Sequence, residues 1–209
     1  MIKVLRISEE LGLYRLFLEN KNDILVNSDD ILKYQLLSKK VINESDYEVL
    51  LKHNTINQCY YDAYKLINQK WYTIHQFKNK LLLKKHDHEL IDIIIDEFIN
   101  NHYLDDDLYE KEYIELKIGQ GFGPFYIKNK LYHLGIMMKT DIDEMMQREA
   151  LLNYFKRCSY KIKNENDFNK EVIKLKKQGF YYDLIIEMYD MLHQEEELCL
   201  STNLRNTVK

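Results

Sequence analysis

The chain of 209 residues has few residues that interrupt helices, because it contains only one proline and six glycines. This composition argues against a turn-rich β-sandwich and against an enzyme with several glycine loops. The three cysteines, Cys59, Cys158 and Cys199, are far apart and show no C-x-x-C spacing, which argues against a disulfide framework and favours a reducing compartment. No apolar run approaches the roughly 20 residues that cross a bilayer. Since the first residues also lack the apolar region of a secretion signal, we expect a cytoplasmic protein.

The chain also lacks a strong charge of one sign. Its 30 Lys and Arg residues against 34 Asp and Glu residues give a formal net charge of −4, so no overall basic excess points to nucleic acid. Hydrophobic residues make up 45% of the chain and charged residues 31%, which excludes both a membrane protein and a disordered charged tail. A globular protein with a hydrophobic core is therefore expected.

The first 26 residues differ from the rest of the chain. Residues 3–7 and 13–18 alternate with a period of about two, and a short link at 9–12 separates them, which is typical of a β-hairpin. Residues 23–26 predict a third short strand. Asn27 then offers a helix N-cap, and from there the pattern is helical almost to the end. We therefore expect a small β region on a mainly helical body.

The helical body contains an internal repeat. The pattern apolar-Lys-Asn-Lys-Leu occurs at 77–81 and again at 127–131, and a weaker copy stands at 171–175. Gly135 and Gly179 each follow the last leucine of their copy by four positions, which is typical of a helix that ends at a left-handed glycine. In the first copy Lys85 occupies this position, so we expect a helix stop that is either differently shaped or mildly strained.

Each copy also carries a signal for the start of its helix. Thr73 and Gln76 match a capping box, and Gly123-Pro124 places proline in the first helical turn. Asn166-Asp167 predicts the start in the third copy. Further amphipathic stretches flank these helices at 60–69, 89–98, 108–117, 141–146, 151–158 and 183–192.

These patterns predict a mainly α fold of tandem three-helix repeats that form an elongated, curved body. The three repeats are expected at 56–104, 105–150 and 151–195. An N-terminal β-hairpin with lead-in helices is expected over 1–55, and a C-terminal tail over 196–209. A three-helix unit of this size buries little apolar surface by itself, so adjacent repeats should share cores. Such a body suits an extended partner better than a small substrate.

Several segments resemble the RecX family of regulatory proteins. The sequences at 104–109, 121–124, 127–131 and 135–136 are similar to the central repeat of that family, and 177–180 resembles part of a flanking repeat. Residues 25–32 are similar to the lead-in of its longer members. The resemblance covers about residues 2–195. It implies a non-enzymatic protein without a cofactor that binds the RecA recombinase filament along its groove. It further implies limits on filament growth, ATP turnover and strand exchange, and thus a role in recombination, DNA repair and the SOS response.

Basic side chains recur on the second helix of each repeat and form the candidate binding surface for the filament or its DNA. The candidates are Lys78, Lys80, Lys84, Lys85, Lys128, Lys130, Lys170, Lys174, Lys176 and Lys177, together with Lys70 and Trp71 ahead of the first of these helices. If the repeats stack in register, these lysines form an interrupted basic stripe. The alternative is a solvent-facing side of each helix with no partner. We expect a monomer that binds single- or double-stranded DNA only weakly.

Other candidates have simpler interpretations. Asp105, Asp106 and Asp107 could bind Mg²⁺, but contiguous aspartates at a helix start more often cap the helix. His86 and His88 lack further ligands at zinc spacing and are expected to be solvated. Residues 119–124 lack the Lys-Ser/Thr of a phosphate loop and predict a flexible connector. Most tyrosines, among them Tyr60, Tyr61, Tyr64, Tyr181, Tyr182 and Tyr189, are assigned to cores between repeats.

Two other functions stay open at this point. Three-helix units can insert a helix into the major groove, so the chain could be a helix-turn-helix DNA-binding regulator that acts without RecA. It could also be a helical adaptor for another partner. The acidic middle repeat, with Glu110, Glu112 and Glu115 near the aspartates, argues against coating duplex DNA. No catalytic constellation and no metal site can be nominated.

Overall fold

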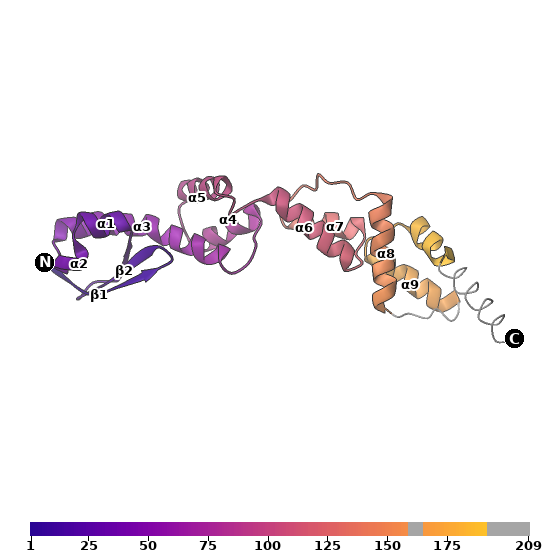
Figure 1. The fold of residues 1–209 in the computed structure, drawn as a ribbon, viewed down its shortest axis with the longest axis horizontal. Helices are drawn as coiled ribbons and strands as arrows, with labels where there is room; N and C mark the ends of the chain where they lie inside the picture. Colours follow the sequence, from indigo (N-terminus) through magenta and orange to yellow (C-terminus); the bar gives the residue numbers. More distant parts are fainter. Residues whose placement is uncertain (159–164, 192–209) are drawn as a thin grey trace, which may run out of the picture. The chain divides into compact units, whose positions relative to one another are not determined.

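The computed structural model describes residues 1–158 and 165–191 (Figure 1). The chain divides into two compact units, Met1–Asp105 (unit 1) and Asp106–Lys209 (unit 2), which are described separately below. Most described residues are helical, and strands occur only in the first 42 residues of the described chain. The mainly α fold with a small N-terminal β region is therefore confirmed.

Unit 1 begins with a four-stranded antiparallel sheet. Its strands are β1 (Ile2–Glu10), β2 (Leu13–Leu18), β3 (Ile24–Val26) and β4 (Val41–Ile42), in the order β3-β2-β1-β4. The predicted hairpin is confirmed: Leu11 and Gly12 link β1 to β2 with φ angles of 54° and 77°, as a two-residue hairpin loop requires. The sequence analysis missed β4, because two residues are too few to show an alternation.

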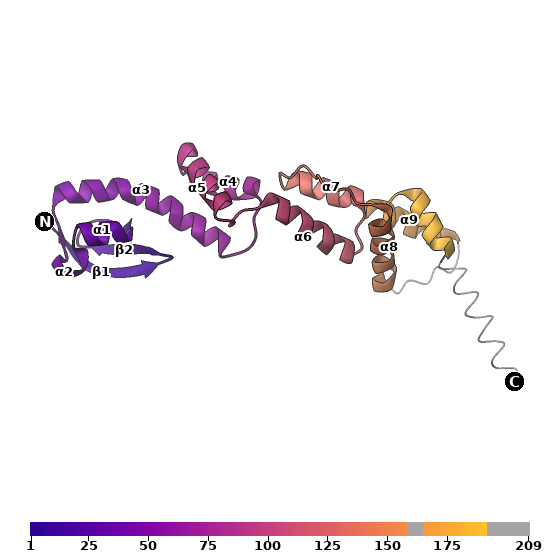
Figure 2. The ribbon, with the colours of Figure 1, turned by 45° about the horizontal axis from the view of Figure 1, so that its top comes forward.

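Three helices complete the N-terminal part of unit 1. They are α1 (Ser28–Lys33), α2 (Leu36–Lys39) and α3 (Glu44–Ile67), and Asn27 caps α1 as predicted by accepting a hydrogen bond from the N–H of Asp30. Figure 2 shows α3 lying alongside the sheet. The side-chain oxygen of Asn54 accepts a hydrogen bond from the N–H of Leu25 at 2.7 Å, and the side-chain amide of Asn57 donates one to the carbonyl of Leu25 at 3.0 Å. These two amides cover the outer edge of β3, which would otherwise expose unpaired backbone groups.

The second half of α3 packs with α4 (Ile74–Leu83) and α5 (His88–Asn100) around a core that includes Phe77, Leu81 and Phe98. The predicted capping box is present, since the Thr73 hydroxyl accepts from the N–H of Gln76 at 3.2 Å and the Gln76 amide accepts from the N–H of Thr73. Because α3 runs without interruption from 44 to 67, it crosses the predicted boundary between 55 and 56.

Of the two alternatives expected for the end of α4, the structure shows the strained one, at Lys85. Its φ angle is 64°, in the left-handed region, whereas Gly135 and Gly179 occupy the same region at 87° and 92°. A residue with a Cβ pays about 1–2 kcal/mol for this conformation. The helix α4 therefore ends in the same left-handed conformation as the segments at Gly135 and Gly179, but without the glycine that favours it.

We predict that Lys85→Gly stabilises the protein by about 0.5–1 kcal/mol, because the relief of left-handed strain exceeds the added entropy of the unfolded chain. Urea denaturation followed by circular dichroism measures the change. Lys80→Gly, in the interior of α4, is the matched control and should destabilise by about 1 kcal/mol. Equal losses in both variants would contradict the assignment of strain to Lys85.

Unit 2 consists of helices over its described residues. They are α6 (Asp106–Gly119), α7 (Pro124–His133), α8 (Glu144–Cys158) and α9 (Glu165–Lys177), followed by a helix described from 182 to 191. Gly123 is the N-cap of α7 and Pro124 its first residue, as predicted. The core joins these helices through Ile114, Ile127, Leu131, Leu151 and Leu175, among others.

Two predictions for unit 2 are wrong in detail. The stretches 141–146 and 151–158 were expected in two different repeats, but α8 is one continuous helix across the predicted boundary at 150, and residues 136–143 contain no helix. Asn166-Asp167 lie inside the first turn of α9 rather than before it, since α9 begins at Glu165. The division into three repeats stays a prediction, and the predicted tail at 196–209 lies outside the described residues.

Candidate binding surfaces

The candidate lysines of unit 1 differ in their surroundings. Lys78 forms an ion pair with Asp92 of α5, and Lys84 lies 2.5 Å from Asp62 of α3. Both positive charges are therefore partly neutralised within the unit. Lys80 and Lys85 are exposed, and the structure records no ion pair for either among residues 1–158 and 165–191. Only part of the predicted basic stripe in unit 1 is thus available to a partner.

Asp62 joins α3 to the segment between α4 and α5. Besides Lys84, it contacts His86, whose Nε2 lies 2.8 Å from the carboxylate. Burial opposes ionisation of Asp62, but the hydrogen bonds from Lys84 and His86 outweigh it and hold the pKa of the carboxyl below its usual value. The expectation of a solvated His86 is wrong, because its side chain is only 10% exposed. Its role is to fasten helices together.

Lys70 and Trp71 lie between α3 and α4. The Lys70 ammonium lies 4.6 Å from the centre of the Tyr72 ring, and Trp71 is 61% exposed. An indole with this exposure buries little of its surface within unit 1 and is accessible to a partner. Trp71 therefore remains a candidate contact residue.

In unit 2, the start of α7 and the end of α9 meet through their backbones. The N–H of Gly123 donates to the carbonyl of Gln178 at 2.8 Å, and the N–H of Phe125 donates to the carbonyl of Gly179 at 3.2 Å. A Cβ on Gly123 would lie 2.4 Å from the Gly179 oxygen. Residues 119–124 were predicted as a flexible connector, but Gly121 and Gly123 are buried and closely packed. We call this contact the α7–α9 junction.

The basic candidates of unit 2 lie on the two helices that meet at this junction. Five lysines, Lys128, Lys130, Lys174, Lys176 and Lys177, are exposed on α7 and α9. Lys174 contacts Glu171 at 3.0 Å, and Lys170, nearer the start of α9, lies 3.7 Å from Asp167. No Asp or Glu occurs at 121–140 or at 172–182, so the later lysines lie in a part of the sequence without nearby acids. We call the exposed side chains of Pro124–His133 and of 172–182 the junction surface.

Exposed aromatic rings lie among these lysines. The rings of Phe125 and Tyr181 are 4.5 Å apart between centroids, although these side chains remain 52% and 50% exposed. Tyr182 is also exposed, and the Lys176 ammonium lies 5.7 Å from the centre of its ring. The sequence analysis missed Phe125 and placed Tyr181 and Tyr182 in cores. Tyr181 lies two residues after Gly179, ahead of the next helix, and Tyr182 is the first residue of that helix.

Known proteins with similar sequences are RecX regulatory proteins. The chain is 25% identical to the Regulatory protein RecX of Streptococcus equi subsp. zooepidemicus over 94% of its length and 79% of that protein. It is 24% identical to the Regulatory protein RecX of Streptococcus agalactiae over 97% of its length and 82% of that protein. No family model matches the chain. The chain is thus similar to RecX regulatory proteins along nearly its whole length.

Two RecX crystal structures share the fold. One superposes with a TM-score of 0.58 at 19% identity and covers 91% of this chain and all of that one. The other, from Lactobacillus salivarius, gives a TM-score of 0.56 at 22% identity and covers 68% of this chain and 99% of that one. The relatives of known name are regulatory proteins.

In the acidic segment at the start of α6, Asp107 and Glu110 make contacts within unit 2 that stabilise the fold. Asp107 forms an ion pair with Lys139 at 2.6 Å, and the hydrogen bond from that ammonium lowers the pKa of the Asp107 carboxyl. Glu110, which is 2% exposed, accepts hydrogen bonds from the N–H groups of Lys139 and Thr140 at 2.9 and 2.7 Å. Within residues 1–158 and 165–191, no group of three or more His, Cys, Asp or Glu is placed to hold a metal ion.

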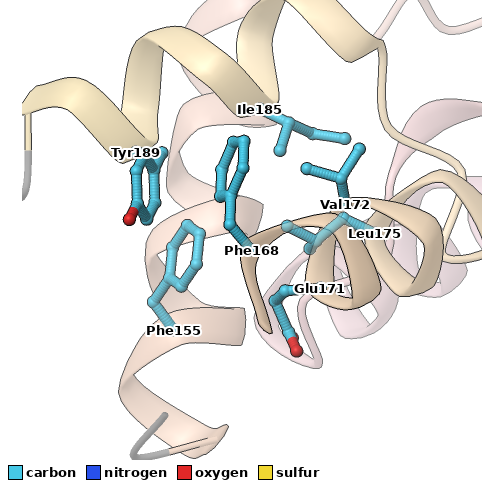
Figure 3. Close-up of a pocket in the computed structure, with 7 residues that line it drawn as sticks. All are labelled: Phe155, Phe168, Glu171, Val172, Leu175, Ile185 and Tyr189. Carbon is cyan, nitrogen blue, oxygen red and sulfur yellow. The ribbon is translucent and has the colours of Figure 1, made fainter. Parts of the chain in front are cut away.

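A small pocket lies between α8, α9 and the helix at 182–191 (Figure 3). Its lining consists of Phe155, Phe168, Glu171, Val172, Leu175, Ile185 and Tyr189. Glu171 accepts a hydrogen bond from the Tyr154 hydroxyl at 2.6 Å and another from Lys174. The pocket interior is too narrow for a water-sized sphere, so it is a packing gap rather than a ligand site.

In the described part of the chain, no helix is long and apolar enough to cross a membrane.

Proposed function

We propose that this chain regulates the RecA recombinase by binding its nucleoprotein filament. Binding limits filament growth, ATP hydrolysis and strand exchange, and the chain acts as a monomer in the cytoplasm without catalysing a reaction itself. The observation that carries the proposal is the match to RecX regulatory proteins along nearly the whole chain, in sequence and in fold. If the chain binds short filaments more tightly than growing ones, it lowers the population of growing filaments in proportion to that difference in affinity.

The exposed lysines of α4, α7 and α9 are the proposed contacts with the filament. Lys78, Lys84, Lys170 and Lys174 have carboxylate partners of their own, which reduces their attraction for a second partner. Lys80, Lys128 and Lys177 provide one exposed lysine on each helix, and none has an ion pair recorded among the described residues. Complementary charge mainly raises the rate of encounter and fixes orientation.

We predict that the purified chain lowers ATP hydrolysis by RecA on single-stranded DNA and shortens its filaments when added in amounts stoichiometric with the recombinase. Phosphate release and electron microscopy of the filaments measure the two effects. The triple variant Lys80→Glu, Lys128→Glu and Lys177→Glu should weaken both about tenfold or more, because each reversal replaces attraction by repulsion.

The matched control reverses three exposed lysines elsewhere, Lys39, Lys52 and Lys111, and should behave like the wild-type chain. Unchanged hydrolysis and filament length with the wild-type chain would reject the proposed function. Equal effects of both triple variants would reject the proposed contacts alone.

A further inference from the structure

The N-terminal sheet has one covered edge and one open edge. On the β3 side, two amide side chains of α3 bond the backbone of the outer strand. On the opposite side, β4 pairs only with Ile2 and Lys3, at the start of β1. Within Met1–Asp105, no strand pairs with the outer edge of β1 over residues 5–10. We call this stretch the open edge; at about 3.3 Å per residue it is about 20 Å long.

The open edge has no neighbour because the chain turns away from it just before β4. Lys40, which directly precedes β4, has a left-handed φ of 51°, and α2 comes immediately before it. The carbonyl of Lys40 accepts a hydrogen bond from the N–H of Val4 at 2.9 Å. Beyond this bond the backbone of unit 1 returns to a helix instead of continuing along β1. Figure 2 shows β1 below β2, on the side of the sheet away from α3.

The register of the hairpin determines which backbone groups face the open edge. Glu10 and Leu13 pair across the two-residue loop. In such a hairpin the residues next to the loop turn their backbone groups toward each other, and successive residues then alternate between the two sides of the strand. Ser8 therefore faces β2 like Glu10, whereas Ile7 and Glu9 direct their N–H and C=O groups outward. These groups are a template for one more strand.

The side chains of the open edge do little to prevent pairing. Natural edge strands often carry basic side chains or proline that oppose the approach of another strand. Here the basic side chain, Arg6, lies over the ring of Phe17, 3.9 Å from its centre. Leu5 is 58% exposed, and Ile7 is half-buried against the core of the sheet. Glu9 is exposed, and no ion pair is recorded for it within unit 1.

We propose that the open edge of β1 binds an extended segment of a partner polypeptide, which joins the sheet as an additional strand. An extended backbone carries donors and acceptors at the two-residue spacing at which Ile7 and Glu9 present theirs. The side chains of these two residues lie on one face of the strand. The bound segment therefore carries an apolar residue beside Ile7 and a lysine or arginine beside Glu9. Its main-chain hydrogen bonds give affinity, and these two side chains give specificity.

This inference goes beyond the proposed function and does not depend on it. The assay contains only the full chain and a synthetic peptide, so a negative result leaves the proposed action on RecA untouched. The probe is the fluorescein-labelled peptide Thr-Val-Thr-Lys-Thr-Val-Thr-Lys, whose valines and lysines share one face of a strand. Fluorescence anisotropy with the chain added up to about 0.5 mM gives the dissociation constant.

Methylated peptides test whether the backbone makes the contact. In an antiparallel pair, valines and lysines opposite Ile7 and Glu9 direct their N–H groups toward β1. Methylation of those nitrogens should weaken binding about tenfold or more, whereas methylation of the threonine nitrogens should change it little. Glu9→Pro removes an outward N–H of β1 and should weaken binding as well. The fold tolerates this proline because the lost N–H has no partner in the sheet.

A charge exchange tests the role of Glu9. Glu9→Lys should weaken binding of the lysine peptide about threefold to fivefold, since it replaces attraction across the strand pair by repulsion. The same variant should bind a peptide with glutamate in place of both lysines more tightly than the wild-type chain does. Glu19→Lys reverses an exposed acid just after β2 and is the matched control, with both affinities unchanged.

Circular dichroism of each variant checks that its fold persists, and size-exclusion chromatography of the chain alone tests a second copy as the occupant. No binding of the lysine peptide would overturn the proposal. Equal affinities of the two methylated peptides would overturn it too, because the contact would then not be a strand pair. A dimer of the wild-type chain that Glu9→Pro dissociates would show that a second copy, not a partner polypeptide, occupies the open edge.

Discussion

Gly123→Ala is expected to destabilise unit 2 by about 3 kcal/mol or more. The backbone of Gly123 has a φ of −85°, which any residue adopts, so the effect arises from contact alone. An added Cβ would lie 2.4 Å from the oxygen and 2.5 Å from the carbonyl carbon of Gly179. Since both atoms belong to the backbone, the start of α7 must move away from the end of α9. That movement adds the loss of two hydrogen bonds to the cost of overpacking.

Urea denaturation measures this loss, and Gly119→Ala is its matched control. Gly119 is the last residue of α6, and a Cβ there would meet no atom within 4 Å. Alanine at 119 should therefore be neutral or stabilise by up to about 1 kcal/mol through its helix propensity. Similar stabilities of the two variants would show that the close approach of the α7–α9 junction does not exist in solution.

This junction also shows where the sequence was informative and where it was not. The helix stop at Gly179 and the start of α7 at Pro124 follow from local chemistry, because a left-handed residue and a first-turn proline act on their own segments. That these two points touch is a tertiary fact. Gly123 and Gly179 are 56 positions apart, and no local pattern indicates that each glycine is required by the other.

The candidate lysines show the same division. The repeated Lys-Asn-Lys pattern predicted which helices carry them, and the structure confirms α4, α7 and α9 as helices. The pattern could not predict which lysine charges are neutralised, because Lys78 pairs with Asp92 of α5 and Lys84 pairs with Asp62 of α3. The exposure of the Phe125 and Tyr181 side chains could not be predicted from the sequence either. Aromatic residues at helical spacing indicate a core by default, and only the absence of neighbouring acids could have marked this region.

The missed strand and the merged helix have different causes. β4 is two residues long, and its pairing with Ile2 and Lys3 depends on a fold that brings the segment back to β1. The segment 136–143 was expected to include a helix because 141–146 is amphipathic. Glu110 instead binds two backbone N–H groups in this segment, which stabilises an extended path that the helical pattern alone disfavours.

Glu110→Ala tests the importance of that buried carboxylate, and we expect a loss of about 3 kcal/mol. The side chain is 2% exposed and belongs to α6, while the two donors, Lys139 and Thr140, lie about 30 positions later. Hydrogen bonds to a charged group contribute about 1.5–3 kcal/mol each, and removal of the acceptor leaves both N–H groups without a partner. The segment that leads from α7 to α8 should therefore lose its attachment to α6.

Two companion variants separate this role from a general effect of charge. Glu110→Gln keeps an oxygen acceptor at the same place and should recover more than half of the lost stability. Glu112→Ala removes an exposed acid from the same helix and should change stability by less than about 0.5 kcal/mol. Amide hydrogen exchange at Lys139 and Thr140 should accelerate in Glu110→Ala and stay unchanged in Glu112→Ala. Slow exchange at both amides in Glu110→Ala would mean that another group, not this carboxylate, fixes the 136–143 segment.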